Sequence, residues 1–401
     1  MSNKKKSYQI GLLFLVFTLY FTFFRSSMSG ILSLFYLSNG ISEGMISSIK
    51  SFQNIGILLG LLPSGFLADK YGRLKIIVAS SLVISFSFFI MLANPNYYMF
   101  SFAEFLYGIG LALNSGTLLA YITSLQENYN VAADSKLMGR QVSVLNFATL
   151  LGGNIGTWLF KIDNHFPLIF SAVGLLTFPI FIFLWIKFFR FTDNRSEKDT
   201  RIKSDGVFFK NINDMVKRES FWELLAINLG YDCGTQFILI YWSILYVEKL
   251  QFNLSIVYTI FIISLILGSE FYRRYIHRFS MVKITYYVSA LLISIFICSY
   301  YLENRYILLT LFFFIEFIMG ILSAQISALS NKIIYGYSNK SQMLTTVSFV
   351  TESVVTVSLV LNNFILEILG DLKIMYIISA LYMSLVFLPL LSSKFRKKIS
   401  I

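Results

Sequence analysis

The sequence predicts an all-α integral membrane protein, and three observations lead to that fold class. Of the 401 residues, 56% are apolar and only 13% are charged, whereas soluble domains carry about 25% charged residues. The apolar residues form runs of about 20 residues, the length that a helix needs to cross a bilayer. Lys and Arg gather in short segments between alternate runs. An ordinary cytosolic enzyme, a secreted disulfide-rich domain and a disordered protein are therefore excluded.

Each apolar run is predicted to be a helix, because a helix satisfies its own backbone hydrogen bonds in lipid. The first run is longer than the apolar region of a signal peptide and has no cleavage site, so we expect an uncleaved span. The twelve predicted spans are Tyr8–Leu37, Gly44–Ala68, Ile76–Ala93, Pro95–Leu125, Leu137–Phe160, Phe166–Phe188, Phe221–Val247, Leu254–Tyr272, Ile284–Leu302, Tyr306–Leu329, Met343–Leu366 and Leu372–Leu391.

Basic residues separate between the two sides of these spans. Lys161, Lys249, Arg305 and Lys373 lie in loops on one side, and nearly all the other Lys and Arg lie opposite, together with both termini. Basic loops face the cytoplasm, so both termini are predicted to be cytoplasmic. The net charge of +12 then reflects membrane topology, and we expect no nucleic-acid partner.

The chain divides into two halves that resemble each other. The polar segment 189–220 is predicted to be a cytoplasmic linker between an N-terminal six-helix bundle, 1–188, and a C-terminal six-helix bundle, 221–401. The segment Glu104-Phe105-Leu106-Tyr107-Gly108-Ile109 recurs 212 residues later as Glu316-Phe317-Ile318-Met319-Gly320-Ile321. The repeat indicates duplication, and transporters built from such halves bind substrate where the halves meet.

The loop between the second and third spans carries the most specific motif. It reads Gly65-Phe66-Leu67-Ala68-Asp69-Lys70-Tyr71-Gly72-Arg73-Leu74-Lys75. Gly65 would let two helices approach closely, and Gly72 suits a tight reversal with a positive backbone angle. Asp69 can pair with Arg73. Membrane topology alone would explain the basic residues of this loop but not its glycines and its aspartate.

This loop resembles the signature of the major facilitator superfamily, and the layout of the whole chain is similar to that of the family. The resemblance implies the major facilitator superfamily fold, in which two six-helix bundles are related by pseudo-two-fold symmetry. It also implies that Gly65, Asp69, Gly72 and Arg73 form a cytoplasmic gate, which closes when the carrier faces outward.

Two further signatures of the family are altered in this sequence. Where the family has an arginine in the fourth span, this chain has Glu104, and Arg25 stands in the first span, where many family antiporters have an acid. We therefore expect Arg25 and Glu104 to form a swapped pair.

The fifth span keeps the glycines of an exporter signature without its proline, in Gly152-Gly153-Asn154-Ile155-Gly156-Thr157. In the family this element favours antiport, although close helix packing would also explain the glycines.

Ionisable side chains inside spans are costly and mark function. Besides Arg25 and Glu104 they are Asp232, Glu316 and Glu352, each about 14–16 Å into its span at 1.5 Å per residue. Carboxylates in a poorly hydrated cavity can exchange protons near neutral pH, so the acids are candidate proton carriers; alternatively, some are structural partners of hydroxyls. The predicted substrate site is completed by polar residues suited to an amphipathic ligand, namely Tyr107, Asn114 and Gln236.

Several function classes lack their motifs. The sequence has no phosphate-binding loop, dinucleotide fingerprint or channel filter. Its cysteines, Cys233 and Cys298, and its histidines, His165 and His277, show no metal-site spacing. We therefore expect neither an enzyme nor a bound cofactor or metal.

Taken as a whole, the sequence predicts a secondary transporter that exports a small organic molecule, cationic or amphipathic, in exchange for protons. We expect a monomer in a bacterial plasma membrane, with substrate, protons and lipid as its partners. Three alternatives stay open: a proton-coupled importer of a sugar, an acid or another metabolite, a lipid flippase, and a membrane sensor that does not transport.

Overall fold

The computed structural model describes residues 3–129, 135–189, 219–333 and 340–391. Every regular element in these ranges is helical. Most of the predicted linker, 189–220, lies outside them, as do the last ten residues of the chain. Large apolar side chains point outward; on α8 (Phe166–Phe189), Ile180, Phe183 and Leu184 are 59–65% exposed. A surface of this kind suits lipid and not water.

The chain forms two compact units. Unit 1 contains Met1–Ile41 and Phe52–Ile202, and unit 2 contains Ser42–Ser51 and Lys203–Ile401. The helix α3 (Glu43–Tyr71) therefore contributes its first turns to unit 2 and its remainder to unit 1. Within unit 2, Glu43 pairs with Lys249 at 2.7 Å, and the Tyr241 hydroxyl donates to the Glu43 carbonyl at 2.7 Å.

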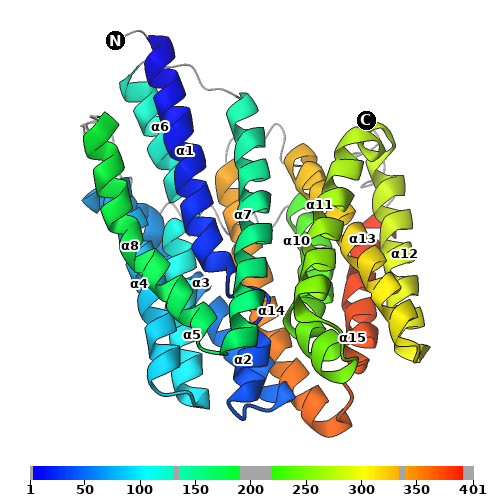
Figure 1. Cartoon of the computed structure of the whole chain (residues 1–401). Helices are drawn as coiled ribbons and strands as arrows, with labels where there is room; N and C mark the ends of the chain where they lie inside the picture. The colour runs from blue at the N-terminus through cyan, green and yellow to red at the C-terminus, as the bar shows by residue number, and fades with distance from the viewer. Residues whose placement is uncertain (1–2, 130–134, 190–218, 334–339, 392–401) are drawn as a thin grey trace. The chain divides into compact units, whose positions relative to one another are not determined.

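Unit 1 packs its helices around α1 and α4. α1 lies against α7 and α8, and α4 lies against α5 and α8 (Figure 1). Besides most of α3, the helices of unit 1 are α1 (Asn3–Ser26), α2 (Leu32–Ser38), α4 (Arg73–Ala93), α5 (Tyr97–Asn114), α6 (Thr117–Asn128), α7 (Ser135–Ile162) and α8.

Two predicted spans of unit 1 are broken. The predicted first span, Tyr8–Leu37, is interrupted over residues 27–31, between α1 and α2. The predicted fourth span, Pro95–Leu125, is interrupted at Ser115 and Gly116, between α5 and α6. Gly116 has φ +72, in the left-handed region that glycine adopts without strain. Neither break was predicted, although Tyr97–Asn128 still counts as one candidate span, and both breaks fall beside residues of the candidate site.

Unit 2 packs its helices around α10. α10 lies against α14 and α15, while α11 packs along α13 (Figure 1). The six-residue π-helical turn η2 continues α10. The elements of unit 2 are α10 (Glu219–Ser243), η2 (Ile244–Lys249), α11 (Leu254–Arg274), η3 (Ile276–Arg278), α12 (Met281–Tyr301), α13 (Arg305–Ile333), α14 (Lys340–Leu369), α15 (Ile374–Met383), η4 (Ser384–Val386) and α16 (Phe387–Leu391).

The internal repeat is visible in helix packing as well as in sequence. In unit 1, α3 and α5 cross where Gly56 and Gly108 each face a backbone carbonyl of the other helix. In unit 2, α11 and α13 cross in the same way at Gly268 and Gly320. Each position of the second crossing follows its counterpart by 212 residues. A Cβ at any of these glycines would collide with backbone, so the close crossings require glycine.

Nine helical segments of the described chain are long and apolar enough to cross a membrane. The number becomes ten if Glu43–Leu61 and Pro63–Tyr71, which meet at a 49° bend in α3, are counted as one span. The helices α7 and α10, which occupy two other predicted spans, carry more polar side chains and are not among them. The chain is a multi-pass membrane protein.

Candidate functional site

Glu104 of α5 is fully buried and is bound by a tyrosine from another helix. The Tyr36 hydroxyl, on α2, donates to Oε1 of Glu104 at 2.5 Å, and neither residue is exposed. Hydrogen bonds to an acid in a dry interior are strong and costly to lose. Glu104 therefore fixes α2 against α5, whatever its state of protonation.

Arg25 lies in the last turn of α1 and contacts Tyr107. Its Nη1 donates to the Tyr107 hydroxyl at 3.3 Å, and Tyr107 lies one turn beyond Glu104 on α5. Among the ion pairs of the described residues, none joins Arg25 to Glu104. The predicted pair is therefore wrong. The predicted first span, Tyr8–Leu37, treated this region as one helix, whereas α1 ends at Ser26, directly after Arg25.

Neighbouring helices hold the end of α1. Gly152 and Gly156 leave no room for a Cβ between α7 and α1, and Gly156 faces the carbonyl of Ser27. From α8, the Ser171 hydroxyl donates to the Phe24 carbonyl, one of those that a helix end leaves without an intrahelical partner. Close packing therefore explains Gly152 and Gly156 of the fifth-span signature. These contacts fix Arg25 at the break.

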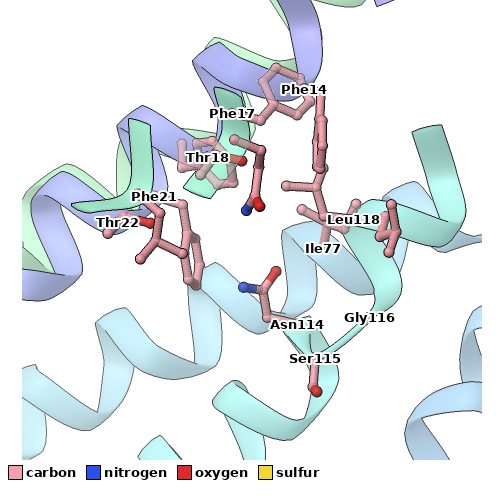
Figure 2. Close-up of a pocket in the computed structure, with 14 residues that line it drawn as sticks. Phe14, Phe17, Thr18, Phe21, Thr22, Ile77, Asn114, Ser115, Gly116 and Leu118 are labelled. Carbon is pink, nitrogen blue, oxygen red and sulfur yellow. The ribbon is translucent and has the colours of Figure 1, made fainter. Parts of the chain in front are cut away.

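A cavity of about 310 Å³ lies within unit 1. It is lined by α1, α4, α7, α8 and the break between α5 and α6 (Figure 2). The predicted site residue Asn114 ends α5 and points its amide into the cavity (Figure 2). Thr18 and Gln141 also line it, and the sequence analysis did not single them out. Gly116, which interrupts an apolar run, is the sequence signal that could have located this cavity.

Glu316 of α13 is the unit 2 counterpart of the acid on α5, but its surroundings differ. It is fully buried, and within the described chain neither carboxyl oxygen makes a hydrogen bond. Three tyrosines lie within electrostatic range. Tyr246 and Tyr376 bind each other, with hydroxyls 2.6 Å apart, and Tyr231 donates to a backbone carbonyl at 3.1 Å. The hydroxyls nearest to this carboxyl are thus engaged elsewhere.

Asp232 of α10 and Glu352 of α14 form a second acidic site in unit 2. Both are half-buried, and they lie close enough to interact electrostatically. Gln236 follows Asp232 by one helical turn and so lies on the same face of α10. Tyr231 is within electrostatic range of both Asp232 and Glu316. The three predicted acids of the second half are therefore gathered around α10.

The motif at the start of α4 has the geometry expected of its charged residues and of Gly72. Gly72 has φ +99, and Oδ1 of Asp69 is 4.0 Å from Nη2 of Arg73. Nη1 of Arg73 donates to the carbonyl of Ala120 on α6 at 2.8 Å. Gly65 differs from its prediction: no described atom lies within 4 Å of the place where its Cβ would be. It follows the bend in α3 and is exposed, so it does not mediate close packing in this structure.

The family profile described as Major Facilitator Superfamily matches residues 12–360. The chain belongs to the major facilitator superfamily. Its fold is that of the superfamily as well. Two crystal structures of the nucleoside transporter NupG align with TM-scores of 0.77 and 0.71. The alignments cover 97% and 98% of this chain and 99% of each NupG chain, at 10% sequence identity, a level that shows the fold alone.

Curated relatives match shorter stretches of the chain. The uncharacterized MFS-type transporter YfkF of Bacillus subtilis (strain 168) is 26% identical over 34% of this chain. The arabinose-proton symporter of the same organism is 30% identical over 32%, and myo-inositol transporter 2 of Schizosaccharomyces pombe is 29% identical over 30%. The matches cover 34%, 25% and 20% of these relatives, so the chain matches well under half of their length.

Proposed function

We propose that this protein is a proton-coupled secondary transporter that moves a small organic molecule across a bacterial plasma membrane. The observation that carries the proposal is Glu316, a fully buried carboxyl without a hydrogen-bond partner in the described chain. Membership of a transporter superfamily supports transport, and this acid supports coupling to protons. The proposal includes the twelve spans and the cytoplasmic termini that the basic residues indicate.

Because Glu316 is buried away from water, its protonation should depend on the conformation of the protein. An unpaired charge in a dry interior costs several kcal/mol, more than the roughly 1 kcal/mol that a typical hydrogen bond contributes. The neutral, protonated carboxyl is therefore favoured while the group is buried. A conformation that admits water would favour the anion and release the proton. Proton binding then depends on conformation, which is what coupling requires.

Asp232 and Glu352 offer a second proton site in the same unit. Two carboxylates that interact across α10 and α14 repel each other when both are charged, and one proton, or a cationic group of a substrate, relieves that repulsion. Gln236 would add a neutral hydrogen-bonding group on the same face of α10. Glu104 is a weaker candidate because the Tyr36 hydroxyl already binds it.

The loop before α4 is proposed as the cytoplasmic gate. Arg73 contacts Asp69 and also binds the Ala120 carbonyl, so it links the loop to α6. Gly72 provides the reversal that brings Arg73 to the first position of α4. We assign Gly65 to the gate on the family resemblance alone.

Export by antiport is the direction that we propose, because the glycines of α7 resemble the exporter signature. Import by symport is the second candidate. It is favoured by the relatives, which include an arabinose-proton symporter and a myo-inositol transporter.

Proton movement in everted membrane vesicles tests the proposal. The interior is acidified, a dye reports the pH gradient, and candidate organic solutes are added one at a time. A transported solute should change the gradient in the wild type, and Glu316→Gln should reduce that response at least tenfold while the protein stays folded. Glu303→Gln, at an exposed acid before α13, is the matched control and should respond as the wild type does.

The sign of the response distinguishes the two directions. Antiport moves protons out as solute enters, so the interior becomes less acidic; symport carries protons inward and makes it more acidic. A Glu316→Gln protein with an undiminished response would contradict the assignment of coupling to this residue.

A further inference from the structure

The cavity in unit 1 has an uncharged lining. Its 14 lining residues, all in the described chain, include no Asp, Glu, Lys, Arg or His. Transferring a charged group into such surroundings without a partner is costly. The cavity therefore selects against ions, in contrast to the acidic sites of unit 2.

Polar residues of three helices line this cavity. The Thr18 hydroxyl of α1 is buried, with 4% of the residue exposed, and among the residues that the structure describes it has no hydrogen-bond partner. The amides of Asn114, from α5, and Gln141, from α7, line the same space and bind no group of the described chain. An unsatisfied buried hydroxyl is costly, so its position favours a polar ligand. Each amide can donate and accept at once, which matches vicinal hydroxyl groups.

Aromatic rings form another wall of the cavity. Phe14, Phe17 and Phe21 come from α1 (Figure 2). Phe178 of α8 also lines the cavity. The rings of Phe17 and Phe178 pack edge to face at 5.7 Å. Such a wall holds the apolar C–H face of a ring whose hydroxyls point toward the polar groups.

The helix break keeps the floor of the cavity open. Gly116 sits between α5 and α6 in the left-handed conformation, and no atom of the described residues lies within 4 Å of where its Cβ would be. The volume of about 310 Å³ is at the lower limit for small-molecule pockets, about 300–1,000 Å³. A ligand of one ring fits this size better than a multi-ring drug does.

We infer that the unit 1 cavity binds an uncharged, hydroxylated ring of monosaccharide size. This inference rests on the proposed function, because it names the class of substrate that the transporter would carry. Asn114 and Gln141 bind its hydroxyl groups, Thr18 supplies a third hydrogen bond, and the phenylalanines cover its apolar face.

Titration calorimetry on the full-length protein in detergent tests the inference, using neutral pentoses, hexoses and cyclitols as probes. Amino-sugar and uronic-acid counterparts of the same ring size are compared with them. At least one neutral probe should bind, and its charged counterparts should bind at least tenfold more weakly. Asn114→Leu and Gln141→Leu should each weaken binding by about 10- to 100-fold, the range for an unmade hydrogen bond in a buried site.

Thr18→Val and Thr123→Val form the matched pair of variants. Both remove one hydroxyl with little change in shape, but Thr123 is exposed on α6, where its hydroxyl donates to the Leu119 carbonyl of the same helix. Thr18→Val should weaken binding, and Thr123→Val should not. Thermal unfolding of each variant shows whether a loss of binding reflects a loss of folded protein.

Three results would overturn the inference: no neutral probe binds the folded protein, charged counterparts bind equally well, or both amide variants bind as the wild type does. The vesicle assay separates this outcome from failure of the proposed function. Binding of a neutral ring without solute-driven proton movement would contradict proton coupling alone. Proton movement driven only by other solutes would contradict the assigned substrate class alone.

Discussion

Tyr36 shows how a single hydroxyl changes the role of a buried acid. Glu104 and Glu316 occupy equivalent positions of the repeat, and both are fully buried. Tyr36 donates to the first at 2.5 Å, whereas the second has no such donor in the described chain. The equivalent acids thus differ in their surroundings, and only Glu316 is proposed here as the residue that exchanges a proton.

Replacing Tyr36 by Phe should destabilise the protein by about 1–3 kcal/mol, the cost of leaving a buried polar group without its hydrogen bond. Thermal unfolding in detergent measures the effect as a lower melting temperature. Tyr8→Phe is the matched control, because Tyr8 is 71% exposed, and it should unfold as the wild type does. Equal melting temperatures for all three proteins would remove the structural role assigned to Tyr36.

The double variant Tyr36→Phe with Glu104→Gln extends this test. If the two side chains act through one shared hydrogen bond, the combined loss of stability should be smaller than the sum of the two single losses. Additive losses would show that the two side chains act independently.

At the scale of helices, the α7 glycines determine how closely α7 approaches α1. Gly156→Ala places a Cβ against the Ser27 backbone, which cannot move aside as a flexible side chain would. We expect a loss of about 1–3 kcal/mol, typical of overpacking, measured by thermal unfolding. Gly65→Ala is the control for stability, because space is open around that position. A Gly156→Ala protein as stable as Gly65→Ala would contradict this account of the packing.

The sequence predicted where helices lie better than where they break. Apolar runs bounded by charges define α4, α8 and α11 closely, because lipid requires long uninterrupted apolar helices. The break after Ser26 carries no proline but contains Gly30, which lowers helix stability, and α7 and α8 contact the end of α1 beside it. The break at Gly116 had a local signal, since glycine lowers helix stability by about 1 kcal/mol relative to alanine.

The candidate sites could be predicted only in part. Glu104, Asp232, Glu316 and Glu352 were found because charges are rare in apolar runs. Their partners could not be found in this way. Tyr36 is one of 24 tyrosines, and its contact with Glu104 crosses 68 positions of sequence. Thr18 and Gln141 are uncharged and common, so only the folded chain identifies them as cavity residues.

For the whole molecule, the distribution of basic residues predicts an orientation that reporter fusions can check. Alkaline phosphatase fused after Asn164, between α7 and α8, should be active, because that loop is predicted to lie outside the cell. Fused after Arg278, between α11 and α12, it should be inactive, and green fluorescent protein at the same position should fluoresce. The reverse pattern would invert the proposed topology.

The division of α3 between the units has a consequence for engineering. The linker is the natural place to join halves from two different transporters, because it separates the two predicted bundles. Such a chimaera would receive residues 42–51 from one parent and their partners Tyr241 and Lys249 from the other. In a functional hybrid, the first turns of α3 should therefore come from the same parent as the second half of the chain.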